Sequence, residues 1–439
     1  MKRIHLLPQD DNTNGWSKLA GPRTANAALR ASVRADWVVV GAGFAGLAAA
    51  HRLAENRPND KVVLIEAQEV GEGASGRNSG FAIDLPHNVG SSLEELDGSH
   101  RFMRLARAGI AHLQTQVETH GIDCDWKRSG KYHAAASQKG TKEVLEPFAK
   151  EMEALGEPYH WVVKEDLAKK LGTAHFDAAV FTPGCILMNP AALTRGLARA
   201  LPENVTLYEH SPVTSVTYQN GVTLDTVAGQ VYAPQMILAV NGFAPQFGFF
   251  QQSLLTMAAH ASLTRPLTDA EHSAIGEIED FGLTPANAFA GITIRYTQDR
   301  RVLIRQNIHF SPGMRVSDAH REKRRREHQR LFKARFPALP HVDIEHTWSG
   351  FICLANNGSP GFGRVSATVH TAVCQNAVGV TKGTIGGLLA ADMASGIDND
   401  MIADMESLGQ PDKLLPRPLL DMGVRAKFAW ELFKSRHEA

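Results

Sequence analysis

Three glycines with close, unequal spacing follow an apolar run near the start of the chain. Gly41, Gly43 and Gly46 come directly after the run 37–40, and an Ala-rich segment with helical periodicity follows them. In this arrangement backbone N–H groups and the positive end of a helix dipole point at a phosphate. Glu66 ends the next apolar run, where a carboxylate binds ribose hydroxyl groups. The stretch 37–66 therefore predicts a strand, glycine turn, helix and strand that bind a dinucleotide; the alternative is a tight turn without a ligand.

A second segment rich in Gly and Ser, residues 71–80, lies directly behind this unit. Such a run gives up too much backbone entropy to form a regular element, so the sequence predicts a loop. It carries Arg77 and Asn78, which can bind a ligand. We expect a loop that wraps the nucleotide rather than a flexible linker.

The composition limits the classes of protein to consider. The chain has 439 residues, which favours two domains, and 46 basic residues balance 46 acidic ones, so no nucleic-acid or membrane partner is indicated. Its cysteines are far apart and show no metal-ligand spacing: Cys124, Cys185, Cys353 and Cys374. We expect no disulfide, no metal site and a reduced, cytoplasmic location. No apolar run reaches membrane-spanning length, and the N-terminus has no apolar region for secretion.

Apolar runs and helical patterns alternate along the chain and predict an α/β fold with two interleaved domains. Residues 1–35 are an expected lead-in, and the nucleotide-binding domain is expected from three stretches, 36–90, 180–250 and 350–400. A substrate domain and helical cover are expected from 91–179 and 251–349, and a helical tail from 401–439.

Several elements within these stretches are predicted individually. The segment 230–240 predicts a buried strand, 289–296 and 301–307 a hairpin, and 388–395 a helix. The basic segment 315–336 is interpreted as an amphipathic surface helix rather than a nucleic-acid site. In the tail, Val424, Phe428 and Leu432 form a stripe that we expect to pack on the body.

The interleaving favours FAD over a nicotinamide dinucleotide. A domain assembled from three stretches suits a long ligand held along its whole length. A second glycine-rich turn, 379–387, precedes the helix expected at 388–395. The N-terminus of such a helix would stabilise negative charge at the N1–C2=O edge of a reduced flavin, and Lys382 would add to that field. The alternative for Lys382 is a solvated turn lysine.

At the level of motifs the chain resembles a known family. The resemblance covers both ends and the middle of the chain, in 35–46, 73–80, 238–242, 348–350 and 360–364, together with the lead-in 14–16. These segments are similar to those of FAD-dependent amine and amino-acid oxidoreductases of the D-amino-acid oxidase superfamily. Within that superfamily, the chain is most similar to the γ-glutamylputrescine oxidase and L-pipecolate oxidase branch.

The resemblance implies a Rossmann-like FAD-binding domain interleaved with an α+β substrate domain whose antiparallel sheet lies over the flavin. Non-covalent FAD is implied, with these binding residues: Gly41, Ala42, Gly43, Phe44, Ala45, Gly46, Glu66, Ala67, Ser75, Arg77, Asn78, Ser79, Val213, Asn241, Lys382, Gly383 and Thr384. The family often has Gly-His-Gly where this chain has Val-Gly-Val-Thr-Lys-Gly, residues 378–383. Some relatives attach the flavin through a cysteine near Trp348, whereas for Cys353 we expect a buried, unreactive thiol.

The expected reaction is oxidation of a C–N bond by hydride transfer to flavin N5, after which water hydrolyses the imine. A small amine or amino acid is the expected substrate: a polyamine derivative, a cyclic imino acid or an N-alkyl amino acid. Electrons would pass to O₂; the alternatives are a dehydrogenase that uses another carrier and an FAD-binding subunit without turnover. The sequence leaves the oligomeric state open.

Candidate residues near the reacting atoms are Lys382, His87, His260 and Arg305, with Asp84, Arg295 and Tyr296 as further substrate contacts. Arg305 shares a strand face with Leu303 and Arg301. Its guanidinium could bind a substrate carboxylate in a bidentate manner, or form a salt bridge at the rim.

Overall fold

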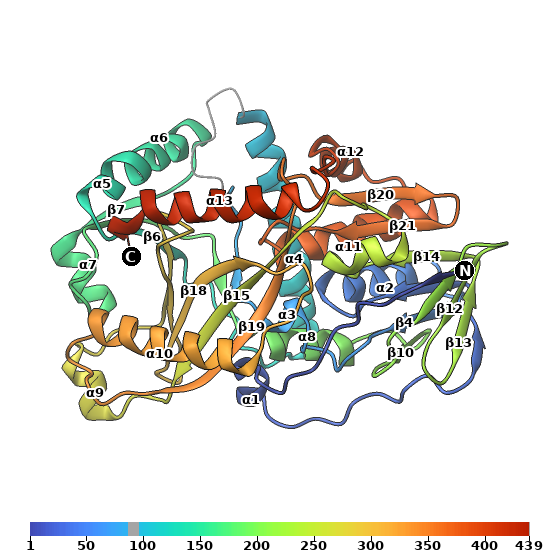
Figure 1. The fold of residues 1–439 in the computed structure, drawn as a ribbon, viewed down its shortest axis with the longest axis horizontal. Coiled ribbons are helices and arrows are strands. Elements are labelled where there is room, and N and C mark those ends of the chain that lie inside the picture. Colours follow the sequence, from blue (N-terminus) through green and yellow to red (C-terminus); the bar gives the residue numbers. More distant parts are fainter. Residues whose placement is uncertain (87–95, 439) are drawn as a thin grey trace.

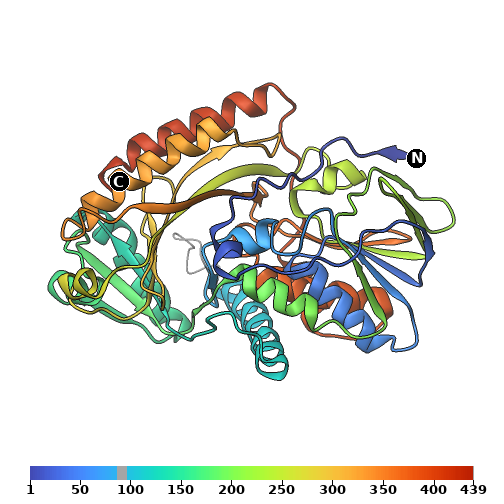
Figure 2. The same cartoon turned by 90° about the horizontal axis from the view of Figure 1, so that it is seen from below.

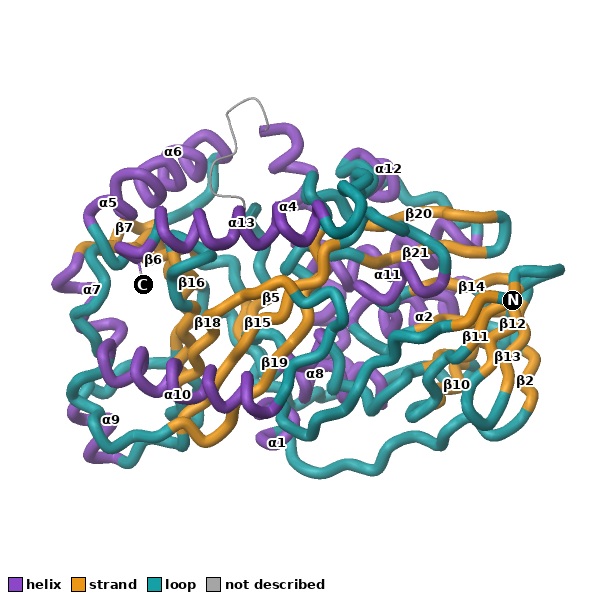
Figure 3. Tube along the Cα trace, in the orientation of Figure 1, coloured by secondary structure: helices purple, strands orange, loops and turns teal. Residues whose placement is uncertain are grey.

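The computed structural model describes residues 1–86 and 96–438. Its strands gather in two groups, which Figure 3 shows at opposite ends of the molecule. One group holds a parallel sheet with helices, and the other holds a large, mostly antiparallel sheet (Figure 1). The fold is therefore mixed α/β, as the sequence predicts.

A six-stranded sheet forms the centre of the first group. Its spatial order is β10 (Val205–Tyr208), β4 (Val62–Ile65), β3 (Trp37–Val40), β14 (Gln235–Leu238), β21 (Val369–Val373) and β20 (Gly361–Ser366). The first five strands are parallel, and β20 is antiparallel to β21. All residues of β3 and β4 are buried, because both faces of the sheet are covered.

Helices cover one face of this sheet and a small sheet covers the other. The helices are α2 (Phe44–Asn56), α4 (Leu96–His120), α8 (Pro190–Arg199) and α11 (Thr381–Ser395). The small sheet has the order β1 (Lys2–Arg3), β11 (Ser215–Thr217), β12 (Val222–Asp225), β13 (Gln230–Ala233) and β2 (Ser32–Arg34). Val38, Val40, Val63 and Ile65 pack toward it in one apolar cluster. This half is thus a three-layer unit around β3.

An eight-stranded sheet forms the second group. Its order is β19 (Ile344–Leu354), β15 (Leu255–Thr264), β18 (Val302–Phe310), β17 (Thr293–Tyr296), β16 (Phe281–Pro285), β6 (Lys131–Ala135), β8 (Ala178–Thr182) and β7 (His160–Val163). All its pairs are antiparallel except β16 with β6. Figure 2 shows α10 (Asp318–Arg335) and α13 (Leu419–Lys434) on its outer face.

The other elements are short. The remaining helices are α1 (Gly15–Leu19), α3 (Ala74–Arg77), α5 (Gln138–Gly140), α6 (Glu146–Leu155), α7 (Lys164–Leu171), α9 (Asp269–Ala274) and α12 (Met401–Ser407), and β5 (Phe81–Ala82) pairs with β9 (Ile186–Leu187). Among the described residues, no helix combines the length and the apolar character that crossing a bilayer requires.

Some expected elements differ in the structure. The single strand predicted at 230–240 is two strands, because Pro234 lacks an N–H and separates β13 from β14, which enter different sheets. A single helical turn, α3, forms inside the predicted loop 71–80. The strands at 178–182 and 344–354 belong to the large sheet. The chain therefore passes from one group of strands to the other at positions that differ from the expected boundaries near 180 and 350.

The C-terminal helix packs less than the sequence predicts. Val424 and Phe428 are half-buried, and the Phe428 ring lies 5.1 Å from that of Phe289. Leu432, the third residue of the predicted stripe, is exposed. Val424 and Phe428 therefore seat α13 on the sheet, and just beyond the helix the buried Glu438 accepts the N–H of Ala136 at 2.9 Å.

Candidate active site

A cavity of about 430 Å³ runs between the two halves of the molecule. At one end it is lined by the glycine turn before α2, by Glu66 and by Val213. At the other end it is lined by residues of the large sheet, including Thr293 and Arg305. The cavity therefore connects a nucleotide-type turn to a polar patch on a different sheet.

The glycine turn has the geometry that a bound pyrophosphate requires. Gly41 has φ +96°, a conformation that favours glycine, and a β-carbon there would lie 2.8 Å from the carbonyl oxygen of Ala239. A β-carbon at Gly43 would lie 2.6 Å from Ser75 Oγ, and one at Gly46 would overlap the carbonyl oxygen of Gly41. Gly41 and Gly43 line the cavity, whereas Gly46 does not and serves the packing of α2 on the sheet.

Glu66 is held in place at the edge of this turn. Its carboxylate accepts the N–H of Ala42 at 2.7 Å and that of Gln68 at 3.0 Å. Burial raises the pKa of Glu66, while these N–H groups act in the opposite direction. A carboxylate fixed in this way can accept ribose hydroxyl groups.

The loop after β4 is bound to the lead-in of the chain. Asn14 Nδ2 donates to the carbonyls of Gly71 and Gly76, and Trp16 Nε1 donates to the Asn78 carbonyl at 2.8 Å. Ser75 Oγ accepts the N–H of Phe44 at 2.9 Å, at the first turn of α2. The loop therefore shapes the wall of the cavity beside the glycine turn.

Arg77 lines the cavity, but its guanidinium N–H groups are bound to other residues of the chain. Its guanidinium pairs with Asp11 at 2.7 Å and Glu72 at 3.2 Å and donates to the Ser349 carbonyl at 3.1 Å. Asn78 Nδ2 donates to the Ser75 carbonyl at 2.6 Å. Arg77 thus ties the lead-in, the loop and β19 together, and a direct contact of its charge with the ligand is not supported.

A second helix begins at the cavity, as the glycine-rich turn predicts. The residues 378–381 and Gly383 line the cavity at the start of α11. Gly387 lies so close to α2 that a β-carbon would overlap the Ala45 carbonyl, which explains the glycine at this position. The N-termini of α2 and α11 therefore both lie at the same cavity.

Lys382 and Thr384 lie on the other side of α11. Lys382 Nζ lies 6.0 Å from the centre of the Phe102 ring, and burial lowers the pKa of Lys382 to about 8. Thr384 Oγ1 donates to the Val380 carbonyl at 2.6 Å. Neither residue lines the cavity, so the expected contact of Lys382 with the flavin edge is not supported.

The large sheet contributes a row of side chains to the cavity. Thr293 on β17 and Arg305 on β18 are register partners, and Arg305 also pairs with Ala261 on β15. Arg305 Nη1 and Thr293 Oγ1 are both buried and have no hydrogen-bond partner among the described residues. Burial lowers the pKa of Arg305 to about 10, so it is a cation at neutral pH. Two neighbouring unpaired polar atoms can bind an anionic oxygen.

His260 lies at the cavity wall, but its ring is engaged elsewhere. Its Nδ1 contacts Ser349 Oγ at 2.9 Å, and its Nε2 contacts His309 Nδ1 at 3.2 Å. Burial, with His309 and His320 nearby, lowers the pKa of His260 to about 2. The role expected for His260 next to the substrate is therefore not supported.

The other expected substrate contacts lie outside the cavity. Arg295 donates to the carbonyls of Gly80 and Met188, and its guanidinium lies 5.1 Å from the centre of the Trp16 ring. Asp84 pairs with Arg107 at 3.4 Å, and Tyr296 is buried in the apolar core of the large sheet. His87 lies outside the described residues.

The structure brings most of the residues expected to bind the cofactor to one cavity. The expected residues in its wall are Gly41, Ala42, Gly43, Phe44, Ala45, Glu66, Ala67, Ser75, Arg77, Asn78, Ser79, Val213, Asn241 and Gly383. Cys353 also lines it, and a hydrogen bond with Cys374, together with burial, holds its pKa well above the usual range, as for an unreactive thiol. Sequence reasoning missed Thr293, because a threonine in an apolar strand has no distinguishing signal.

Comparison with known proteins identifies the class to which this fold and cavity belong. The family model described as FAD dependent oxidoreductase matches residues 36–393. The chain therefore belongs to this family and is an FAD-dependent oxidoreductase, and the expected superfamily and cofactor are confirmed.

Individual relatives agree with this assignment. The chain is 26% identical to a probable oxidoreductase OrdL of Haemophilus influenzae, over 92% of each chain. It is also 26% identical to the γ-glutamylputrescine oxidoreductase of Escherichia coli, over 84% of this chain and 85% of that one. Among solved structures, glycine oxidase from Geobacillus kaustophilus has the same fold, with a TM-score of 0.71 and 20% identity over 87% of this chain and 100% of that one.

The cavity fits FAD in its chemistry. The glycine turn lacks the β-carbons that would exclude a pyrophosphate, Glu66 offers a fixed carboxylate, and a second helix begins farther along the same wall. Residues of the first turn of α2 would hold the phosphates, and Glu66 would hold the ribose.

Proposed function

We propose that this oxidoreductase oxidises the C–N bond of a small amine or amino acid that carries a carboxylate. Bound FAD would accept the hydride from the carbon next to nitrogen, and the imine product would be hydrolysed by water. The observation that carries the proposal is Arg305 Nη1, which is buried in the wall of the cavity and has no partner in the part of the chain that the structure describes.

Arg305 supports a carboxylate because a buried guanidinium nitrogen without a hydrogen bond is costly, and no described residue bonds to its Nη1. Its neighbours in the cavity wall include Thr284, Thr293 and Ala261, none of which is an acid. An anionic group from outside the chain would therefore complete the pairing, and the hydroxyl of Thr293 would add a hydrogen bond to it. The substrate would be fixed by this end and present its C–N bond to the flavin.

The names of several relatives are consistent with such a substrate. One is called γ-glutamylputrescine oxidoreductase, and two with solved structures are called glycine oxidase and iminodiacetate oxidase. The compounds in these three names, γ-glutamylputrescine, glycine and iminodiacetate, are amines that carry a carboxylate. Arg305 is the residue that we propose for binding this shared group in this chain.

The chain's own groups contribute binding and orientation rather than proton transfer. The carboxylates of Asp11 and Glu72 are both paired with Arg77, and His260 stays neutral and faces its neighbours. An amine that arrives unprotonated needs no strong base, since hydride transfer and loss of the N–H proton give the imine. The reaction would then depend mainly on alignment of the substrate.

An anaerobic screen of flavin bleaching tests the proposal. Polyamines, γ-glutamyl amines, cyclic imino acids and N-methyl amino acids would be added to the purified holoenzyme. We expect bleaching by members that carry a carboxylate, and release of hydrogen peroxide on admission of air if O₂ is the acceptor. Bleaching without peroxide would indicate a dehydrogenase, and no bleaching by any amine would contradict the proposed function.

A further inference from the structure

Three histidines from separate elements meet on the outer side of the large sheet. They are His260 on β15, His309 on β18 and His320 on α10, and one ring nitrogen of each lies within 4.8 Å of the others. The α10 helix covers the strands at this place (Figure 2). His309 and His320 are only half-buried, so solvent reaches the cluster.

The distances are those of ligands around one small cation. Two nitrogens bound to a tetrahedral zinc ion at about 2.0–2.1 Å lie about 3.3 Å apart. His260 Nε2 and His309 Nδ1 are 3.2 Å apart. Modest rotation of the His320 ring would bring its nitrogen to the same centre, since the three atoms already lie within 4.8 Å.

The surroundings orient the rings as a metal site does. His260 Nδ1 lies 2.9 Å from Ser349 Oγ, so this nitrogen can donate to the hydroxyl, and the lone pair of Nε2 then points to His309 Nδ1 at 3.2 Å. His320 Nε2 is buried and has no hydrogen-bond partner among the described residues. A bound cation would satisfy His320 Nε2 and take the place of the contact between His260 Nε2 and His309 Nδ1.

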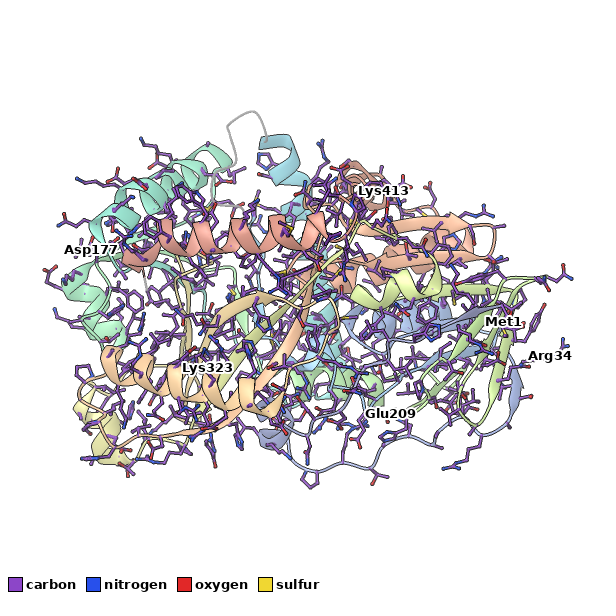
Figure 4. All side chains as sticks on the ribbon, in the orientation of Figure 1. Met1, Arg34, Asp177, Glu209, Lys323 and Lys413 are labelled. Atoms are coloured by element: carbon purple, nitrogen blue, oxygen red, sulfur yellow. The ribbon has the colours of Figure 1, made fainter. Side chains whose placement is uncertain are left out.

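The charges around the cluster keep its rings neutral. Burial lowers the pKa of all three histidines, to about 2 for His260 and about 4 for His309, and Arg324 acts in the same direction. Arg324 itself pairs with Glu327 at 2.5 Å, which reduces its repulsion of a cation. Lys323, labelled in Figure 4, is a further nearby cation on α10. Neutral imidazoles are the form that binds metal.

We infer that His260, His309 and His320 form a binding site for a borderline transition-metal ion such as Zn²⁺. Three imidazoles without a carboxylate select such ions over Mg²⁺ and Ca²⁺, which require oxygen ligands. The fourth position would be taken by water. The ion would fasten α10 to β15 and β18, and this inference does not depend on the identity of the substrate.

The test is equilibrium dialysis of the untagged holoenzyme against Zn²⁺, with metal and protein measured by elemental analysis. We expect one equivalent per chain, a higher Tm with Zn²⁺ than with Mg²⁺, and three nitrogen neighbours in X-ray absorption. His309→Ala and His320→Ala should each weaken zinc binding at least tenfold. The control His341→Ala, which changes an exposed histidine outside the cluster, should bind as the wild type does.

Two outcomes would overturn the site. One is a wild-type chain that takes up no zinc, and the other is uptake that is the same in the double variant His309→Ala/His320→Ala. Both replaced residues are half-buried. If either variant fails to fold, His320→Gln, which keeps a polar side chain of similar reach, gives the same comparison.

An independent observation concerns α13, which carries an apolar stripe on its solvent side. Leu419, Met422, Trp430 and Phe433 are 58%, 66%, 62% and 60% exposed. Their spacing of three, eight and three residues places them on one side of a helix. By helical position Phe428, whose ring meets Phe289, lies on the opposite side of the helix from the stripe.

Basic residues flank the stripe, and acids lie away from it. By helical position Arg425, Lys427 and Lys434 lie beside the stripe, whereas Asp421 and Glu431 lie farther round, on the half-buried side. The guanidinium of Arg436 lies 4.4 Å from the centre of the exposed Phe433 ring. Exposed Trp and Phe with lysines at the flanks suit the interface of an anionic bilayer.

We propose that α13 binds in the plane of an anionic membrane surface, with Leu419, Met422, Trp430 and Phe433 inserted between headgroups. This contact is peripheral, since no described helix can span a bilayer. A second copy of the chain offers no complementary charge at the stripe, because that surface would bring lysines against lysines.

Sedimentation with vesicles of phosphatidylcholine alone or mixed with phosphatidylglycerol tests this proposal on the holoenzyme. We expect binding only to the mixed vesicles, at least tenfold weaker for Trp430→Ser/Phe433→Ser and for Lys427→Glu/Lys434→Glu. Val227→Ser, which changes a 78% exposed valine elsewhere, is the control and should leave binding unchanged. No binding by the wild type, or a dimer in solution that Trp430→Ser/Phe433→Ser dissociates, would overturn the proposal.

Discussion

Thr293 on β17 and Arg305 on β18 face each other across two antiparallel strands, and each has a buried polar atom without a hydrogen-bond partner among the described residues. Both residues line the cavity that begins at the glycine turn. Because unpaired buried groups cost free energy, a pair of them in a cavity wall indicates a ligand contact rather than a packing role.

Replacement of Thr293 by valine should weaken substrate binding while leaving the fold intact. Valine keeps the shape but removes the hydroxyl, so the loss is one hydrogen bond, about 1 kcal/mol, or about a fivefold rise in KM. The unpaired hydroxyl also disappears from the free enzyme, so Tm should stay the same or rise. Steady-state kinetics and calorimetry check both expectations.

Thr284→Val is the matched control for that substitution. The Thr284 hydroxyl lies 3.2 Å from His133 Nδ1 and 3.4 Å from the Tyr132 carbonyl. Thr284→Val removes both contacts and should therefore lower Tm. A Thr293→Val enzyme with unchanged KM and a lowered Tm would assign Thr293 to the fold instead.

Arg295→Ala should destabilise the protein without a specific effect on KM. The buried guanidinium donates to the carbonyls of Gly80 and Met188. Without it the Gly80 carbonyl keeps the Met188 N–H, but the Met188 carbonyl loses its charged donor, at a cost of about 1–3 kcal/mol. Thermal unfolding should show a Tm several degrees lower. A large rise in KM at unchanged Tm would instead indicate that Arg295 binds the substrate.

Lys382 should make stability rise with pH above about 8. Burial lowers its pKa to about 8 in the folded chain from the ordinary 10.5, so the unfolded chain binds more protons between these values. The charged form is disfavoured in the fold, by about 3 kcal/mol at pH 7. Lys382→Met should therefore raise Tm at pH 7, and its advantage should shrink as the pH rises from 8 to 10.

A pH series of thermal melts measures this effect. The exposed Lys169 provides the control, because Lys169→Met removes a lysine whose side chain is 79% exposed. An advantage of Lys382→Met that stays constant from pH 7 to pH 10 would mean that Lys382 does not change its protonation in this range.

Gly46→Ala should abolish FAD binding. A β-carbon at this position would overlap the Gly41 carbonyl, so the turn and α2 would have to move apart. The purified variant should be colourless, or bind added FAD at least a hundredfold more weakly. Gly98→Ala in α4, where no described atom lies within 4 Å of an added β-carbon, should stay yellow. A Gly46→Ala protein with a full complement of FAD would contradict this account of the turn.

The local sequence was sufficient to predict the nucleotide end of the site. The turn 41–46 depends on short-range constraints, glycine conformation and helix packing, which leave a clear spacing in the sequence. Glu66 follows from the same unit, and the structure places its carboxylate against the Ala42 N–H.

The substrate end depends on long-range pairing, which a single sequence does not reveal. Arg305 could be proposed from its strand face, but its partner Thr293 emerges only when β17 and β18 are in register. Arg295 was a further candidate by sequence, although it faces the loop at Gly80. The histidine cluster is a further case, since His260, His309 and His320 have no ligand spacing along the chain.

Helix α11 shows how tertiary packing overrides local propensity. The sequence predicts a helix only from Leu388, because Gly383, Gly386 and Gly387 are typical of a turn. The helix begins at Thr381, where contact with α2 leaves no room for a β-carbon at Gly387. Glycine there is a requirement of close helix packing rather than a break in the helix.

The most direct test of the central claim compares wild type and Arg305→Ala on matched substrates with and without a carboxylate. Anaerobic flavin reduction would be followed with a cyclic imino acid and with the cyclic amine that lacks the acid group. The wild type should prefer the acid, and Arg305→Ala should lower kcat/KM for the acid by about 10- to 100-fold, with no change for the amine and no loss of FAD. An equal loss on both substrates, or no loss on the acid, would contradict the role of Arg305 as the carboxylate anchor.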